Sequence, residues 1–271
     1  MINEQAIGFM DSGVGGLTVV KQALKQLPRE TVIFIGDQAR LPYGPRPSAQ
    51  VKDFSWQMAT FLLKQNIKML VIACNTATAA ALPDLRAKLK IPVIGVISPG
   101  SRAAIKASKN HRIGVIATEG TIRSNAYRDA ILAKDPSATV ISKACPKFVP
   151  LVESNEYRSP VAKRVVAEGL QDFKHSGIDT LVLGCTHYPL LRPLIQNVVG
   201  PNVTLIDSGA ETVNGVSFML DYLDIANTSS TKAQPDHYYT TGSATQFATI
   251  AKDWLGQPNF KATQIDLGGD L

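Results

Sequence analysis

The stretch LVIACNTATAAAL, residues 70–82, decides the fold class. Its apolar beginning reads as a buried strand that stops at Cys74, and the polar residues Asn75, Thr76 and Thr78 then lead into a helical pattern. A second stretch, LVLGCTHYPLL at residues 181–191, repeats this outline around Cys185. Apolar strands that alternate with helices are typical of parallel βα units. The sequence therefore predicts an α/β fold with both cysteines at the carboxyl ends of strands.

The same alternation continues on both sides of these stretches. We expect strands at residues 7–10, 31–35, 69–73, 93–97, 140–142 and 237–240, and helices at residues 17–27, 48–64, 78–89 and 211–223. Four landmarks recur in the same order at an offset of about 110 residues, among them Cys74 and Cys185. The repeat predicts two similar parallel-sheet α/β domains with a cleft between them. The first comprises residues 1–97 and 208–271, because the tail is expected to return to it, and the second comprises residues 98–207.

Composition excludes several classes of protein. The chain has 271 residues, a formal charge of +6 and only three cysteines, which does not suggest a disulfide framework. Its N-terminus lacks a basic region followed by a long apolar one, and no apolar run could span a bilayer. The basic residues are scattered, without a nucleic-acid-binding motif. We expect a cytoplasmic protein that binds neither membrane nor nucleic acid.

The two repeated cysteines are candidates for reactive thiols. A thiol at a helix N-terminus is expected to have its pKa lowered from about 8.5, and the free N–H groups beside it can bind a carboxylate. Cys145 lacks a polar successor or a matched partner and is expected to be an inert core residue. No Cys-x-x-Cys pair occurs and His187 is the only histidine close to either thiol, so we expect no metal site.

The glycine-rich stretch DSGVGG, residues 11–16, joins the first strand to the first helix. Its glycines permit a tight turn and close approach of the backbone to an anion. The stretch partly matches a dinucleotide fingerprint, in which Asp37 would bind the ribose, but Thr18 stands at the third glycine position. An NAD-binding oxidoreductase is therefore a weaker alternative.

Four motifs together carry a family resemblance: DSGVGG at 11–16, LPYG at 41–44, CNTATA at 74–79 and GCTHYPLL at 184–191. In this order they resemble the cofactor-independent aspartate/glutamate racemase superfamily, over about residues 7–215. The resemblance implies interconversion of L- and D-glutamate without pyridoxal phosphate or metal, supplying D-glutamate for peptidoglycan. The residues around both cysteines, CNTATA and GCTHYP, resemble glutamate racemases more than aspartate racemases. An aspartate racemase is the nearest alternative. A non-catalytic module that binds DNA gyrase is a further alternative, and a homodimer is expected.

The resemblance also implies roles for individual residues. Cys74 and Cys185 would be the two acid/base groups, with Asp11 assisting Cys74, and His187 and Glu153 assisting Cys185. The substrate contacts would be Asp11, Ser12, Tyr43, Gly44, Asn75, Thr76, Thr118, Thr121, Thr186 and His187. A racemase needs a base on each face of the α-carbon, which two opposed thiols can supply. No arginine lies within the motifs, so we expect backbone N–H groups and neutral side chains to bind the substrate carboxylates.

Overall fold

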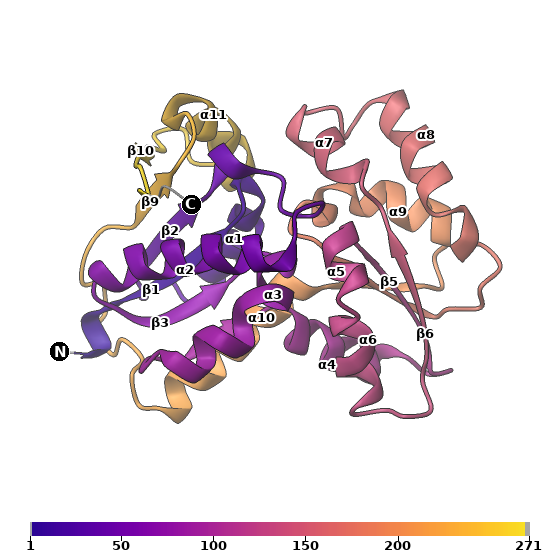
Figure 1. The fold of residues 1–271 in the computed structure, drawn as a ribbon, viewed down its shortest axis with the longest axis horizontal. Helices are drawn as coiled ribbons and strands as arrows, with labels where there is room; N and C mark the ends of the chain where they lie inside the picture. Colours follow the sequence, from indigo (N-terminus) through magenta and orange to yellow (C-terminus); the bar gives the residue numbers. More distant parts are fainter. Residues whose placement is uncertain (1, 269–271) are drawn as a thin grey trace.

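A six-stranded parallel sheet forms one half of the computed structural model, which describes residues 2–268. Its strands run in the order β10 (Thr263–Gln264), β9 (His237–Thr240), β2 (Val32–Gly36), β1 (Ala6–Asp11), β3 (Ile67–Ile72) and β4 (Val93–Gly95). Every neighbouring pair is parallel. The tail strand β9 pairs with β2, so residues 237–240 belong to this sheet (Figure 1).

A four-stranded parallel sheet forms the other half. Its order is β6 (Thr139–Ala144), β5 (Arg112–Ala117), β7 (Thr180–Gly184) and β8 (Thr204–Asp207). Its strands follow the same pattern as β2, β1, β3 and β4: the first strand lies between the second and the third, and the fourth is at the edge. The predicted fold class of two similar parallel-sheet α/β domains is confirmed.

Helices cover both faces of each sheet (Figure 1). The first sheet is covered by α2 (Ser48–Lys64) and α3 (Asn75–Lys88) on one face, and by α1 (Leu17–Gln26), α10 (Ser208–Tyr222) and α11 (Ala244–Leu255) on the other. The second sheet carries α4 (Ile97–Ala107), α5 (Glu119–Arg123), α6 (Ala126–Leu132), α7 (Phe148–Glu153), α8 (Pro160–Gly169) and α9 (Arg192–Val199). Short 3-10 turns complete the chain: η1 (Ile2–Glu4), η2 (Val14–Gly16), η3 (Gln38–Arg40), η4 (Gln171–Phe173) and η5 (Tyr188–Leu191).

The expected element boundaries were wrong at several places. The helix expected from residue 78 begins at Asn75, because the sulfur of Cys74 accepts a hydrogen bond from the N–H of Ala77 and caps it. The strand expected at 93–97 ends at Gly95, and α4 begins at Ile97. Pro99 lies in the first turn of α4, where its missing N–H costs no hydrogen bond. Helix α11 was not anticipated.

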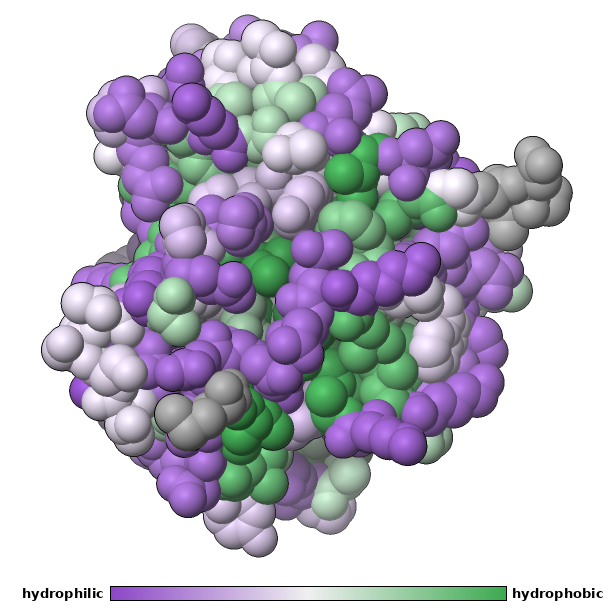
Figure 2. Space-filling view, turned by 90° about the vertical axis from the view of Figure 1, so that its left-hand side faces the viewer, coloured by the Kyte–Doolittle hydropathy of each residue, from purple (hydrophilic) through white to green (hydrophobic). Residues whose placement is uncertain are grey.

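The outer surface carries both hydrophobic and hydrophilic side chains. Figure 2, which views the end of the molecule formed by the first sheet, shows hydrophobic patches separated by hydrophilic side chains. Within residues 2–268, no helix is long and apolar enough to cross a membrane.

A buried ion pair ties the tail to the first sheet at the end opposite the thiols. The ammonium of Lys68, fully buried on β3, lies 2.6 Å from the carboxylate of Glu30. It also donates to the carbonyl of Ile225 at 2.7 Å, while Glu30 accepts from the N–H of Asn227 at 2.7 Å. Desolvated charges of this kind are tolerated only when each is paired.

We expect Lys68→Met to lower the free energy of unfolding by about 3–5 kcal/mol, because it leaves the Glu30 carboxylate unpaired in the interior. Chemical denaturation measures the loss. The control is Lys88→Met, which removes a lysine with a 64% exposed side chain and a surface partner, and should change stability by less than about 0.5 kcal/mol. Equal losses in the two variants would contradict the assignment.

Candidate active site

The two repeated cysteines line one small pocket. Cys74 follows β3 and Cys185 follows β7, so each thiol reaches the pocket from the carboxyl end of a strand in a different sheet. The cavity measures about 20 Å³, which is room for roughly one water molecule. Its walls are formed by Ser12, Leu41, Pro42, Tyr43, Gly44, Cys74, Asn75, Thr76, Thr118, Val149, Cys185, Thr186 and His187.

Three of the predicted site residues do not line the cavity but lie one hydrogen bond behind its wall. Asp11 contacts Thr186, Glu153 contacts His187, and Thr121 contacts Thr76. Three apolar wall residues, Leu41, Pro42 and Val149, were missed by the sequence analysis. Leu41 and Pro42 stand directly before Tyr43 in the LPYG motif, which could have indicated them, whereas Val149 carries no polar signal and only the tertiary fold brings it to the pocket.

Cys185 has a charged partner. Its sulfur lies 3.7 Å from Nδ1 of His187, whose Nε2 is 2.5 Å from Oε1 of Glu153 at the end of α7. Burial lowers the pKa of His187, but the hydrogen bonds with Cys185 and Glu153 outweigh it and raise the pKa to about 10. The ring is therefore an imidazolium at neutral pH, and it places a positive charge beside the Cys185 sulfur.

The chain after Cys185 differs from the chain after Cys74. Residues 188–191 form the 3-10 turn η5, and α9 begins only at Arg192. Pro189 in η5 and Pro193 in the first turn of α9 lack backbone N–H groups, which disfavours one continuous α-helix directly after the thiol. The expected helix N-terminus at Cys185 is thus absent, and His187 takes over as the positive group.

Cys74 is buried near a carboxylate, whereas Cys185 lies beside a cation. Its thiol donates to the hydroxyl of Ser12 at 3.7 Å, and that hydroxyl is 3.5 Å from Oδ1 of Asp11. Burial is the largest effect and, together with the charge of Asp11, raises the pKa of Cys74 to about 12. The N–H of Ala77 opposes this shift, as expected at a helix N-terminus, but is too weak. The expectation of a lowered pKa was wrong for Cys74.

Asp11 joins the two halves of the pocket. It is fully buried, its Oδ1 accepts from the N–H of Gly13 at 3.0 Å, and its Oδ2 accepts from the hydroxyl of Thr186 at 3.3 Å. Burial raises the pKa of Asp11 to about 6, although the charge of His187 and these hydrogen bonds lower it. The carboxylate therefore changes charge close to neutral pH.

The glycines of DSGVGG allow this close approach. A Cβ at Gly15 would lie 2.4 Å from the hydroxyl oxygen of Thr186 and 2.5 Å from Cε1 of His187. No real Cβ contact is that short, so only glycine lets the turn pack against the Cys185 motif. The close approach expected of these glycines is made to the second domain.

Neutral hydrogen-bonding side chains follow Cys74 and meet it at the pocket. The hydroxyl of Thr76 lies 2.8 Å from that of Thr118 and 3.2 Å from that of Thr121, which are 3.1 Å apart. Asn75 is buried; its Oδ1 accepts from the hydroxyl of Tyr127 at 2.7 Å, and its Nδ2 has no hydrogen-bond partner. A buried amide without a partner is costly, and a carboxylate in the pocket would satisfy it.

Asp37 holds the loop that bears Tyr43. The buried Asp37 carboxylate accepts from the Tyr43 hydroxyl, from Nε of Arg40 at 2.7 Å and from the hydroxyl of Thr241 at 2.8 Å. Burial and Asp37 raise the pKa of Tyr43 well above its usual range, so its hydroxyl keeps its proton. The carboxylate considered for a nucleotide ribose is thus occupied by side chains of this chain.

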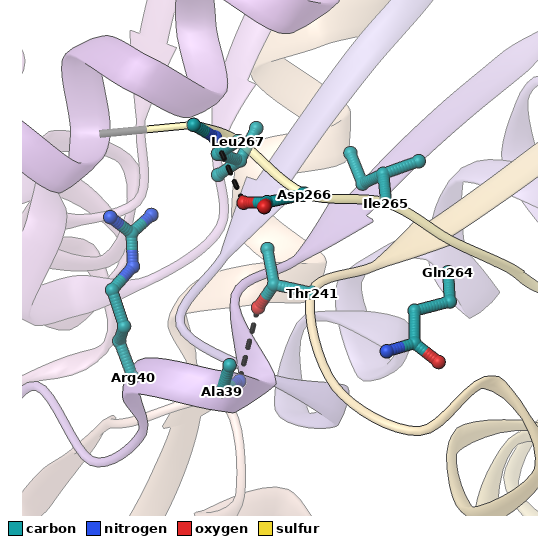
Figure 3. A pocket seen from close by; sticks show the side chains of 8 residues that line it. Ala39, Arg40, Thr241, Gln264, Ile265, Asp266 and Leu267 are labelled. Carbon is teal, nitrogen blue, oxygen red and sulfur yellow. Dashed lines mark hydrogen bonds between the residues drawn. The ribbon is translucent and has the colours of Figure 1, made fainter. Parts of the chain in front are cut away.

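A larger hollow of about 540 Å³ lies beside this network, at the β10 edge of the first sheet (Figure 3). Arg40, Thr241 and Asp266 line it, and none of its lining residues is a cysteine or histidine. The third thiol, Cys145, is buried in the apolar core outside the wall of the thiol pocket. Within residues 2–268, no cluster of three or more His, Cys, Asp or Glu side chains could hold a metal ion.

Comparison with known proteins places this chain in a family. The sequence pattern of the Asp/Glu/Hydantoin racemase family matches residues 7–216. The chain belongs to this family. It is 78% identical over 270 residues to a glutamate racemase of Lactiplantibacillus plantarum, covering 100% of this chain and 99% of the relative.

Solved structures agree. The glutamate racemase isoform RacE1 of Bacillus anthracis superposes with a TM-score of 0.94 at 44% identity, covering 98% of both chains. The glutamate racemase of Francisella tularensis, solved in complex with D-glutamate, superposes with a TM-score of 0.90 at 34% identity, again covering 98% of both chains. The chain is therefore an amino-acid racemase that acts on glutamate.

Proposed function

We propose that this racemase inverts glutamate by a two-base mechanism in which Cys74 and Cys185 serve opposite faces of the α-carbon, without a cofactor. The observation that carries the proposal is that two buried thiols from equivalent strand ends line one pocket, each with its own titratable helper. The sulfurs are close enough that a charge on Cys185 raises the pKa of Cys74. A negative charge on one sulfur therefore disfavours a second negative charge on the other.

The proton transfers follow from these charges. With one enantiomer, the Cys185 thiolate takes the α-proton while the Cys74 thiol gives a proton to the other face, so Cys185 ends as a thiol and Cys74 as a thiolate. With the other enantiomer the roles reverse. The imidazolium of His187 stabilises the thiolate at Cys185, and Ser12 and Asp11 provide a hydrogen-bonded route for the proton of Cys74.

The α-proton of an amino acid is weakly acidic, so charge that moves onto the α-carboxylate must be stabilised. We assign this role to the unpaired amide of Asn75 and the hydroxyls of Thr76 and Thr118, with Thr121 hydrogen-bonded to Thr76 behind them. We assign the binding of the side-chain carboxylate to three other residues of the pocket wall: Thr186, Tyr43 and Gly44. Donors fixed in a dry pocket stabilise such charge better than water does.

The cavity of about 20 Å³ is too small for glutamate. Since its walls come from both domains, we propose that the domains separate to admit substrate and close over it. Closure removes water from the thiols and brings the hydroxyls of Thr76 and Thr118 together.

We propose further that the D-glutamate formed is used for peptidoglycan synthesis, and that the enzyme works in the cytoplasm as a homodimer. All three cysteines are unpaired, as suits a reducing compartment. Growth of a D-glutamate-requiring bacterium carrying this gene tests the supply of D-glutamate.

Racemisation in D2O by the dialysed enzyme, without added cofactor and with a chelator present, tests the mechanism. Two bases place solvent deuterium at the α-carbon of the product enantiomer first, while the remaining substrate keeps its hydrogen. Equal early labelling of both enantiomers would mean a single base. Activity that is lost on dialysis and restored by pyridoxal phosphate or a metal would overturn the cofactor-independent proposal. Parallel runs with aspartate, which should react more slowly, test the substrate.

Glu153→Gln is expected to shift the alkaline limb of the kcat/KM profile to lower pH, by about one unit or more. The negative charge of Glu153 holds the pKa of His187 high, so His187 loses its proton at lower pH once that charge is gone. A pH–rate profile measures the shift. Glu156→Gln, three residues away on the exposed surface, is the control and should leave the limb in place. An unmoved limb in Glu153→Gln would contradict the role of the pair.

A further inference from the structure

A second hollow shares Thr76 with the thiol pocket but is much larger. Its volume is about 230 Å³, against about 20 Å³ for the thiol pocket. It is lined by the segment that leads into α2, by the first turn of α2, by the start of α3 and by α5. These helices lie where the two halves of the molecule meet (Figure 1). Both halves therefore contribute walls to this hollow, as they do to the thiol pocket.

Two arginines, one from each half, line the hollow. Arg46 stands just before α2, and Arg123 is the last residue of α5. None of the residues that line the hollow is acidic. Within residues 2–268, neither arginine forms a salt bridge, and the Arg123 guanidinium has no hydrogen bond either. Two cations that face one hollow repel each other unless an anion lies between them.

The other groups at this end of the hollow are also suited to an anion. Arg46 is held in place, because its Nε donates to the carbonyl of Arg40 at 2.9 Å and its Nη1 to Oε1 of Gln50 at 3.2 Å. Ser48, the first residue of α2, lines the hollow. The first turn of α2 has neither a side-chain cap nor an acidic residue, so the positive end of this 17-residue helix is not neutralised there.

We propose that this hollow binds a phosphate-sized oxyanion, either inorganic phosphate or the phosphate group of a small metabolite, between Arg46 and Arg123. Guanidinium groups present planar pairs of N–H donors that match the oxygens of a phosphate. The anion supplies the negative charge that the walls of the hollow lack. Because the two arginines come from different halves, the bound anion also joins the halves.

The hollow is next to contacts that close the thiol pocket. The N–H of Gly120, which lines the hollow, donates to the carbonyl of Gly44 at 2.8 Å. The hydroxyls of Thr76 and Thr118 lie 2.8 Å apart beside it. An anion held by both halves therefore opposes their separation at this wall. The kinetic consequence rests on the domain separation proposed above, whereas the binding of the anion does not.

The consequence is a brake on the exchange of substrate and product. Glutamate enters and leaves only when the halves separate, so an anion that holds them together slows both steps. We expect phosphate to lower kcat and kcat/KM by the same factor and to leave KM unchanged. This pattern is noncompetitive inhibition, and it differs from the competitive inhibition expected of an anion in the thiol pocket.

Isothermal titration calorimetry with inorganic phosphate, at constant ionic strength, tests the site. We expect one phosphate per chain. Arg46→Gln with Arg123→Gln should weaken binding by about 100-fold or more, because hydrogen bonds between charged groups are the strong ones. The control, Arg29→Gln with Arg128→Gln, removes one exposed arginine from each half and the same total charge, and should weaken binding by less than about threefold. A wild-type chain that binds no phosphate, or equal weakening in the two double variants, would overturn the site.

Initial rates of racemisation test the brake. The Arg46→Gln, Arg123→Gln variant should match the wild-type rate without phosphate and resist inhibition by it. Competitive inhibition that persists in this variant would place phosphate in the thiol pocket and overturn the proposal. Phosphate that binds through the arginines without inhibiting would overturn the brake alone.

Two further titrations complete the test. Cys74→Ser should bind phosphate as the wild type does, so a failure of the two-base mechanism and a failure of this site are distinguished. Glycerol phosphate separates the two sources of the anion. Tighter binding of glycerol phosphate than of inorganic phosphate would assign the site to a phosphorylated metabolite, and the reverse order would assign it to free phosphate.

Discussion

Serine in place of either Cys74 or Cys185 is expected to slow racemisation by about 1,000-fold in both directions. The hydroxyl keeps nearly the size and hydrogen-bonding capacity of the thiol, but it is a far weaker acid. Each variant therefore lacks the base for one enantiomer and the acid for the other. Racemisation in either direction needs both groups, so both directions are slowed. Following optical rotation from L- and from D-glutamate measures both directions.

Deuterium exchange distinguishes the two thiols. The variant that keeps Cys185 can still remove the α-proton of the enantiomer that presents it to Cys185, and returns deuterium to the same face. The variant that keeps Cys74 does this with the other enantiomer. Cys145→Ala is the matched control, because its thiol is buried outside the wall of the pocket. Either serine variant racemising at the wild-type rate would exclude the two-base mechanism.

Local patterns in the sequence predict several residues of this site. An apolar run that ends on a cysteine and a polar residue places Cys74 and Cys185 at strand ends without any knowledge of the fold, and the repeat relates them. The hydroxyl cluster of Thr76, Thr118 and Thr121 joins residues more than 40 positions apart, and only the family resemblance suggested it.

What the sequence could not predict depends on burial. A helix N-terminus lowers a thiol pKa, but desolvation by the closed pocket is the larger effect on Cys74, and no local pattern reports it. The contact between Asp11 and Thr186 spans 175 residues, and the apolar wall residue Val149 carries no polar signature. These features arise only when the two domains meet.

Gly15→Ala is expected to lower kcat/KM by about 100-fold or more. The added methyl group would lie 2.4 Å from the Thr186 hydroxyl oxygen and 2.5 Å from Cε1 of His187, closer than a Cβ can approach. Both side chains are buried and hydrogen-bonded, Thr186 to Asp11 and His187 to Glu153, which limits their escape. Since the ring of His187 holds the Cys185 sulfur at 3.7 Å, displacing it moves a reacting atom. A misplacement of roughly 1 Å is enough for a loss of this size.

Gly215→Ala is the matched control for Gly15→Ala. Gly215 lies inside α10, where a Cβ would have no neighbour closer than 3.9 Å and alanine favours the helix. That variant should keep its activity and gain up to about 1 kcal/mol in the free energy of unfolding. Gly15→Ala should instead lose activity while the fold measured by circular dichroism is retained, because the clash lies at the domain contact rather than inside a sheet. Full activity in Gly15→Ala would mean that the DSGVGG turn does not set the position of His187.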